Sequence, residues 1–82
     1  MLTGKKVLVI GLARSGKAAV KLLQKLNATI TINEGKELEK IEGYQAYLDA
    51  GIEIVAGGHP DELFERDFDF VVKNPGINYH KP

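Results

Sequence analysis

Apolar and polar residues follow one another in blocks that predict four strands separated by helices. Runs rich in apolar or β-branched residues, typical of strands in a buried parallel sheet, occur near residues 6–10, 28–32, 52–55 and 68–72. Segments with helical spacing lie between them, near residues 15–26, 44–50 and 61–64. Strands that alternate with helices require right-handed crossovers, so we expect an α/β domain with a parallel sheet of about four strands in the order 3-2-1-4.

Local signals set the expected ends of these elements. Ser15 is a candidate N-cap of the first helix, and Asn27 suits a left-handed stop after it. Gly51 should end the second helix, and Pro60 suits the start of the third. The charged residues 36–42 predict a solvated loop or a frayed helical turn. The first helix should bury a face of alanine and leucine side chains: Ala18, Ala19, Leu22, Leu23 and Leu26.

The first strand runs directly into a glycine-bracketed loop, residues 11–16 (GLARSG), and a helix follows at once. The glycines permit a sharp turn and a close approach of the backbone to a ligand. The start of the helix points its free N–H groups and the positive end of its dipole at the loop, which favours phosphate. The segment therefore predicts a nucleotide-binding strand–loop–helix in a Rossmann-like domain of three layers.

Three interpretations of this loop remain open. As a dinucleotide fingerprint it has Ala13 at the middle glycine, which crowds a dinucleotide but leaves room for a single diphosphate. As a P-loop it has Ala18 where a hydroxyl should hold Mg²⁺, which is the more damaging departure. In the third interpretation the glycines serve only the turn and helix–sheet packing, and nothing binds.

Composition narrows the class of protein. The 82 residues suit one small domain, the net charge of zero gives no sign of nucleic-acid binding, and the absence of cysteine excludes disulfides. No apolar run approaches the roughly 20 residues of a membrane span, so we expect a cytoplasmic protein. The two histidines, His59 and His80, lack the spacing of metal ligands, and we expect no metal site. The acidic stretch 61–69 should be a solvated surface.

Polar turns follow the second and fourth strands. Asn33-Glu34-Gly35 comes some 20 residues after the glycine loop, and Asn74-Pro75-Gly76 ends the last strand. The carboxyl ends of strands 1, 2 and 4 share one edge of the predicted sheet, where open α/β sheets bind their ligands. The chain stops just after this last turn, and we expect it to be a fragment of a longer protein.

With these turns in view, the chain resembles the N-terminal domain of the Mur ligases, in particular those that add D-glutamate. The resemblance covers essentially the whole chain and rests on residues 7–16 (VLVIGLARSG), 33–35 (NEG) and 71–77 (VVKNPGI), the last being the most specific. It implies a three-domain enzyme of peptidoglycan synthesis that joins D-glutamate to UDP-N-acetylmuramoyl-L-alanine through an acyl phosphate made from ATP. The N-terminal domain would hold the UDP moiety. ATP, Mg²⁺ and the catalytic residues would belong to the absent domains, so this fragment should bind but not catalyse.

The resemblance also implies the binding residues. Arg14 and Ser15 match residues that cradle the diphosphate, and Gly16 shapes the start of the helix. Asn33 matches a position that is often aspartate and reads the uracil edge, which an amide also can do. The remaining implied contacts, to the base, the ribose or the whole uridine, are Glu34, Gly35, Asn74 and Gly76.

Two other functions stay open from the residues alone. One is an NAD-type dinucleotide-binding regulatory domain, in which Glu34 would be the ribose-binding acid. The other is a structural domain that binds nothing. For the ligase fragment we expect a monomer whose partners are UDP-N-acetylmuramoyl-L-alanine and the absent domains, with no nucleic acid and no membrane.

Overall fold

The computed structural model describes residues 1–12 and 14–73, without the side chains of Arg14 and Ser15. Strands and helices alternate along this part of the chain, as the hydrophobic pattern predicts. In chain order the elements are β1 (Lys6–Ile10), α1 (Arg14–Lys25), β2 (Thr29–Glu34), the 3₁₀ turn η1 (Leu38–Lys40), α2 (Tyr44–Asp49), β3 (Glu53–Ala56), α3 (Asp61–Phe64) and β4 (Phe70–Lys73).

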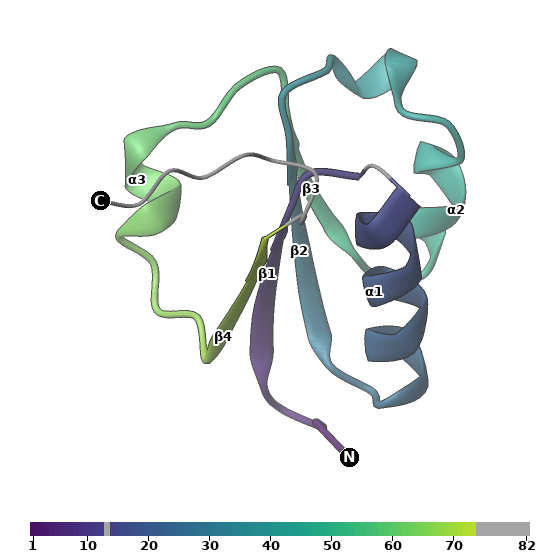
Figure 1. Ribbon diagram of the computed structural model, residues 1–82, viewed down its shortest axis with the longest axis vertical. Coiled ribbons are helices and arrows are strands. Elements are labelled where there is room, and N and C mark those ends of the chain that lie inside the picture. The colour runs from purple at the N-terminus through teal and green to yellow at the C-terminus, as the bar shows by residue number, and fades with distance from the viewer. Residues whose placement is uncertain (13, 74–82) are drawn as a thin grey trace.

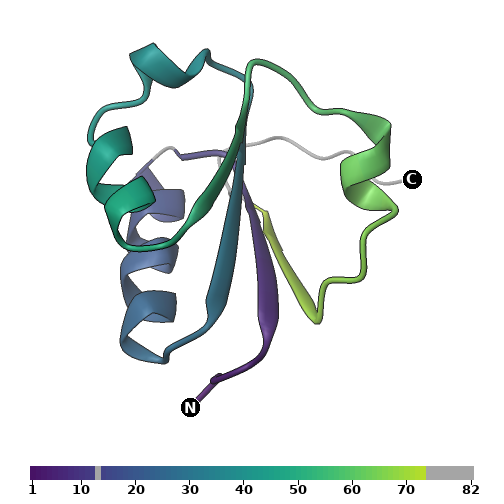
Figure 2. The ribbon, with the colours of Figure 1, turned by 180° about the vertical axis from the view of Figure 1, so that it is seen from behind.

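All four strands form one parallel sheet in the order β3-β2-β1-β4, which confirms the predicted topology. Helices α1 and α2 lie on one side of the sheet and α3 lies on the other, so the domain has three layers (Figures 1 and 2). The strand pairing places four residues in one row across the sheet: Val55, Asn33, Ile10 and Lys73. The segments that follow these residues therefore emerge at the same edge.

Strand β1 carries the core because its side chains alternate between two buried faces. Val7 and Val9 are fully buried in the cluster under α1 and α2, which also contains Ile32. Leu8 and Ile10 point to the other face, where they pack against Leu63 of α3. Both faces of β1 are thus removed from water, and the strand reads as a continuous apolar run.

Helix α1 buries a face that matches the predicted one only in part. Leu23 is buried as predicted and Ala19 and Leu26 are half-buried, whereas Ala18 is exposed and Leu22 is 57% exposed. Val20 and Gly16 are buried in their place. Residues 16, 20 and 23 are spaced by four and three positions, which aligns them along one side of a helix. Position 18 lies about 200° around the helix from position 16, so the alanine and leucine pattern placed the stripe too far toward it.

The ends of the elements are mostly as predicted. Asn27 stops α1 in the left-handed conformation with φ 64°, and Gly51 follows α2 with φ 85°. Some limits were wrong. Strand β2 continues through Asn33 and Glu34, because both residues pair with β3. Strand β4 begins at Phe70, two residues later than predicted, and α1 begins at Arg14, so Ser15 lies in its first turn.

The acidic stretch forms a solvated surface, as predicted, because every acidic side chain within residues 61–69 is exposed. Tyr44 and Tyr47 of α2 are partly buried against the larger core cluster. Across residues 1–12 and 14–73 no helix has the length and apolar character needed to cross a membrane. The same residues contain no group of three or more side chains arranged to hold a metal ion.

Candidate functional site

The carboxyl edge of the sheet brings the glycine loop to the end of β2. Gly11 directly follows β1, and its N–H donates a hydrogen bond of 2.8 Å to the backbone carbonyl of Asn33. Because Ile10 stands between Asn33 and Lys73 in the sheet, the end of β4 lies at the same edge. The structure therefore brings together the three strand ends that the sequence placed at one site. Asn74, Gly76 and the side chains of Arg14 and Ser15 lie outside the described residues.

The backbone requires glycine at both ends of the loop. Gly11 has φ 88°, a left-handed conformation that favours glycine. Gly16 sits in the first turn of α1 and points its Cα at Gly11. A Cβ at position 16 would overlap the Gly11 carbonyl oxygen and lie 3.1 Å from its carbonyl carbon. The glycines thus set the turn and the close packing of α1 on β1, whatever ligand the loop holds.

Asn33 is fully buried, and the chain itself uses all of its side-chain polar atoms. Its Nδ2 donates to the carbonyl oxygens of Val55 and Gly58 at 3.0 and 2.8 Å. Its Oδ1 lies 2.5 Å from Nδ1 of His59. The amide therefore joins the end of β2 to the loop between β3 and α3, and it is not exposed at the edge.

Glu34 holds the glycine loop against the turn that follows β2. Its Oε1 accepts a hydrogen bond of 2.9 Å from the backbone N–H of Leu12, and its Oε2 accepts one of 3.1 Å from the N–H of Lys36. Leu12 is itself buried in the larger core cluster. A carboxylate that accepts two backbone N–H groups fixes the relative position of the two turns.

Gly35 leaves the surface beside this turn open. It is exposed, and a Cβ at this position would lie 3.5 Å from Nε2 of His59, an ordinary van der Waals contact. His59 is also exposed and follows Gly57 and Gly58 at the end of β3. Gly57 donates its N–H to the backbone carbonyls of Glu34 and Lys36 at 3.0 and 2.8 Å, so the β3 loop is attached to the β2 turn.

A pocket of about 240 Å³ opens on the side of this edge that faces α1 and η1. Three lysines and two glutamates supply its charges, and Lys17 forms an exposed ion pair of 3.5 Å with Glu42 at its rim. An exposed pair of this kind contributes little to stability. The pocket is lined by Leu12, Lys17, Glu34, Lys36, Lys40, Ile41 and Glu42.

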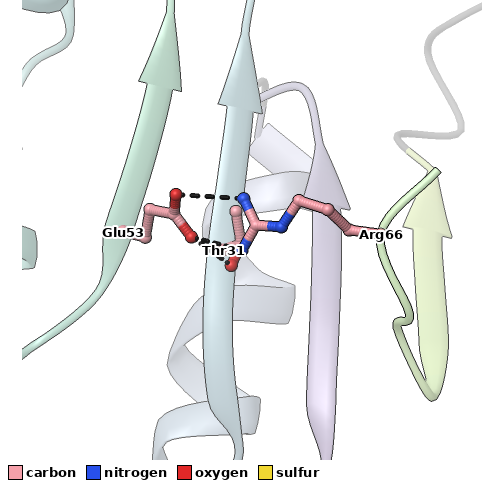
Figure 3. Close-up of polar contacts among 3 residues, drawn as sticks. All are labelled: Thr31, Glu53 and Arg66. Atoms are coloured by element: carbon pink, nitrogen blue, oxygen red, sulfur yellow. Dashed lines mark hydrogen bonds and ion pairs between the residues drawn. The ribbon is translucent and has the colours of Figure 1, made fainter. Parts of the chain in front are cut away.

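A separate polar network lies near the opposite, amino end of the sheet, on the face that carries α3. Arg66 reaches across the sheet to Glu53 of β3, with hydrogen bonds of 2.8 and 3.0 Å, and Thr31 of β2 donates to the same carboxylate at 3.1 Å (Figure 3). These hydrogen bonds, above all those from Arg66, lower the pKa of Glu53, although partial burial opposes the shift. Glu53 in turn raises the pKa of Arg66. These three residues also line a pocket of about 340 Å³ on this face of the sheet.

Two groups that hydrogen-bond to the predicted site residues are not predicted by the sequence: the imidazole of His59, which contacts Asn33, and the N–H of Leu12, which contacts Glu34. The sequence pattern addresses His59 only as a possible metal ligand, and no motif points to the N–H of Leu12. The signal for His59 was its place after two glycines at the end of the third strand. The predicted strand order places the third strand beside the second, but a single sequence does not indicate that the loop folds back on the end of β2, because that contact depends on the register of the two strands and on the path of the loop.

The fold and this edge define a Rossmann-like α/β domain with a glycine loop at its carboxyl end. No protein-family model matches the chain. Several curated proteins are similar to the chain in sequence, and they carry the name UDP-N-acetylmuramoylalanine–D-glutamate ligase. The Streptococcus thermophilus protein is 53% identical over 81 residues, which is 99% of this chain and 18% of the relative. Those of Streptococcus sanguinis and Streptococcus pyogenes are 55% and 50% identical over 92% and 95% of the chain, each match covering 17% of the relative.

The chain is therefore homologous to the N-terminal part of UDP-N-acetylmuramoylalanine–D-glutamate ligases, and the predicted resemblance to Mur ligases is confirmed. It spans less than a fifth of the length of these relatives.

Proposed function

We propose that the chain binds the UDP moiety of UDP-N-acetylmuramoyl-L-alanine, as the N-terminal part of an ATP-dependent ligase that adds D-glutamate in the cytoplasm. The observation that carries this proposal is the 53% identity across 99% of the chain to a ligase whose name specifies both substrates. D-Glutamate, ATP and Mg²⁺ would be held by the domains that make up the rest of the ligase. Because the chain spans less than a fifth of these ligases, we propose that it is by itself a non-catalytic monomer.

The geometry of the glycine loop supports a diphosphate at the start of α1. The turn at Gly11 and the absence of a side chain at Gly16 bring the loop backbone against the first turn of a helix of 12 residues. The free N–H groups of that turn favour an anion, and Arg14 and Ser15 belong to it. We assign the diphosphate to this turn.

The uridine would lie beside the end of β2 and over Gly35, and we propose that Asn74 and Gly76, which follow β4 in the sequence, also contact it. Glu34 supports this place by holding the glycine loop and the β2 turn together through Leu12 and Lys36. Asn33 is buried at the end of β2, where its amide already forms three contacts inside the chain. For its side chain to read uracil directly, those contacts would have to break, so we assign it to positioning.

An amide NMR titration with UDP tests the proposal, with NAD and ATP run in parallel. Shifts confined to the first turn of α1, the residues around Gly35 and Asn74 with UDP alone would support it. A stronger response to NAD at residues 11–16 and Glu34 would favour a dinucleotide-binding domain instead. No response to any of the three nucleotides would contradict UDP binding by this chain.

A further inference from the structure

The hydrogen bonds of Asn33 determine which nitrogen of His59 carries its proton. Both partners of Asn33 Nδ2 are carbonyl oxygens, which only accept, so the amide orientation is fixed with Oδ1 toward His59. Oδ1 is also an acceptor, and the 2.5 Å contact with His59 Nδ1 therefore needs a proton on Nδ1. In the neutral ring Nε2 then carries a lone pair and accepts hydrogen bonds.

That acceptor faces the proposed uridine site. His59 is exposed, and Nε2 forms no hydrogen bond within residues 1–12 and 14–73. It stands 3.5 Å from the position of a Cβ on Gly35, which has no side chain to cover it. The contacts of Gly57 with Glu34 and Lys36 hold the loop that carries His59 at this place.

We propose that His59 is a ligand-binding residue whose Nε2 accepts a hydrogen bond from a donor of the uridine moiety. This role rests on the proposed function. The donors of uridine are the ribose hydroxyls and the N3–H of uracil. Rossmann-like folds place an acceptor for the ribose at the end of the second strand, usually a carboxylate. Here the amide at that place is buried, and the imidazole that it orients presents the acceptor at the surface.

The test compares UDP binding by the parent chain with binding by His59→Phe, which keeps a ring but has no acceptor, and His59→Gln, whose amide offers both a donor and an acceptor. We expect UDP affinity to fall about tenfold in His59→Phe, as for loss of one hydrogen bond, and to recover in part in His59→Gln. The matched control is His80→Gln, which leaves His59 as the only histidine.

Three UDP analogues identify the donor. Methylation of uracil N3, removal of the ribose 2′-hydroxyl or removal of the 3′-hydroxyl each deletes one donor, and the difference between His59→Phe and the parent chain should vanish with one of the three. If the difference persists with all three, His59 does not accept from any of these groups and the proposed role is overturned. If His59→Phe binds UDP as tightly as the parent chain, the role of His59 fails while UDP binding stands. If the parent chain does not bind UDP, both proposals fail.

Nitrogen NMR of the ring gives a readout that does not depend on whether His59→Phe folds. In the His80→Gln variant the neutral ring should carry its proton on Nδ1. Addition of UDP should shift the Nε2 resonance far more than that of Nδ1. A proton on Nε2, or an Nε2 resonance unchanged at saturating UDP, would overturn the proposal.

Discussion

Asn33 and Glu34 are neighbours in the chain, yet their side chains serve opposite faces of the sheet. Asn33 shares its face with Ile10 and the α3 side, where it contacts the loop that carries His59. Glu34 points to the side of α1 and accepts the N–H of Leu12. Strand geometry causes this divergence, because successive side chains of β2 alternate between faces. One strand end thus organises the turns on both sides of the candidate site.

The packing of Gly16 against Gly11 predicts that Gly16→Ala destabilises the domain. The added methyl would overlap a backbone carbonyl oxygen that cannot rotate away, so α1 must shift. We expect a loss of about 1–3 kcal/mol in the free energy of unfolding, measured by urea denaturation. Gly35→Ala is the matched control, since its methyl meets only an ordinary contact and should change stability by less than about 0.5 kcal/mol. Equal stability of the two variants would contradict the overlap.

The burial of Asn33 predicts that Asn33→Asp is destabilising although it keeps the shape of the side chain. A carboxylate would face the carbonyl oxygens of Val55 and Gly58 with no proton to donate. We expect a loss of about 1–3 kcal/mol at pH 7. Burial beside these oxygens should raise the pKa of the new carboxyl, so the loss should shrink in acid, where the group is protonated.

Chemical denaturation at pH 7 and pH 4 measures this difference relative to the parent chain. Asn27→Asp is the control, because it makes the same chemical change at an exposed position just beyond the end of α1. Its charge lies near the negative end of the helix dipole, and its effect should stay below about 1 kcal/mol. A neutral effect of Asn33→Asp at both pH values would show that the amide does not hold its three partners.

The two hydrogen bonds of Glu34 predict a local effect on the loops. In Glu34→Ala the N–H groups of Leu12 and Lys36 lose their acceptor, and we expect a loss of about 1–2 kcal/mol in unfolding free energy. Faster hydrogen exchange at the Leu12 amide should accompany it. Glu37→Ala, at an exposed position without a capping hydrogen bond, should leave exchange unchanged. Unchanged protection of Leu12 in Glu34→Ala would refute the contact.

The Glu53–Arg66 pair predicts a small dependence of stability on acid pH. The pKa of Glu53 is lowered in the folded state, so its contribution is present above the unfolded value of about 4.5 and is lost as pH falls through the lower folded value. Both side chains are nearly half exposed, at 45% and 49%, so solvent screening keeps the effect small. Unfolding followed from pH 6 to pH 3 should show a shallower slope in Arg66→Met than in the parent chain. Equal slopes would contradict the lowered pKa.

The sequence alone determined the architecture because its signals are local. A short continuous apolar run such as residues 7–10 is typical of a strand that is buried on both faces of a parallel sheet. Asn27 and Gly51 mark helix ends through their own backbone preferences. The alternation of strands and helices, with the right-handed crossover rule, then leaves the order 3-2-1-4.

Only the tertiary structure decided what each polar residue at the sheet edge contacts. Asn33 is buried because β2 continues for two more residues and pairs Asn33 and Glu34 with β3. No local sequence signal indicates this extension of the strand. The same holds for α1, where contact with the sheet buries the line through Gly16, Val20 and the predicted Leu23 but leaves Ala18 and Leu22 exposed. Local preferences fix which elements form. The side-chain partners depend on strand register and packing between segments distant in sequence, and these exist only once the sheet is assembled.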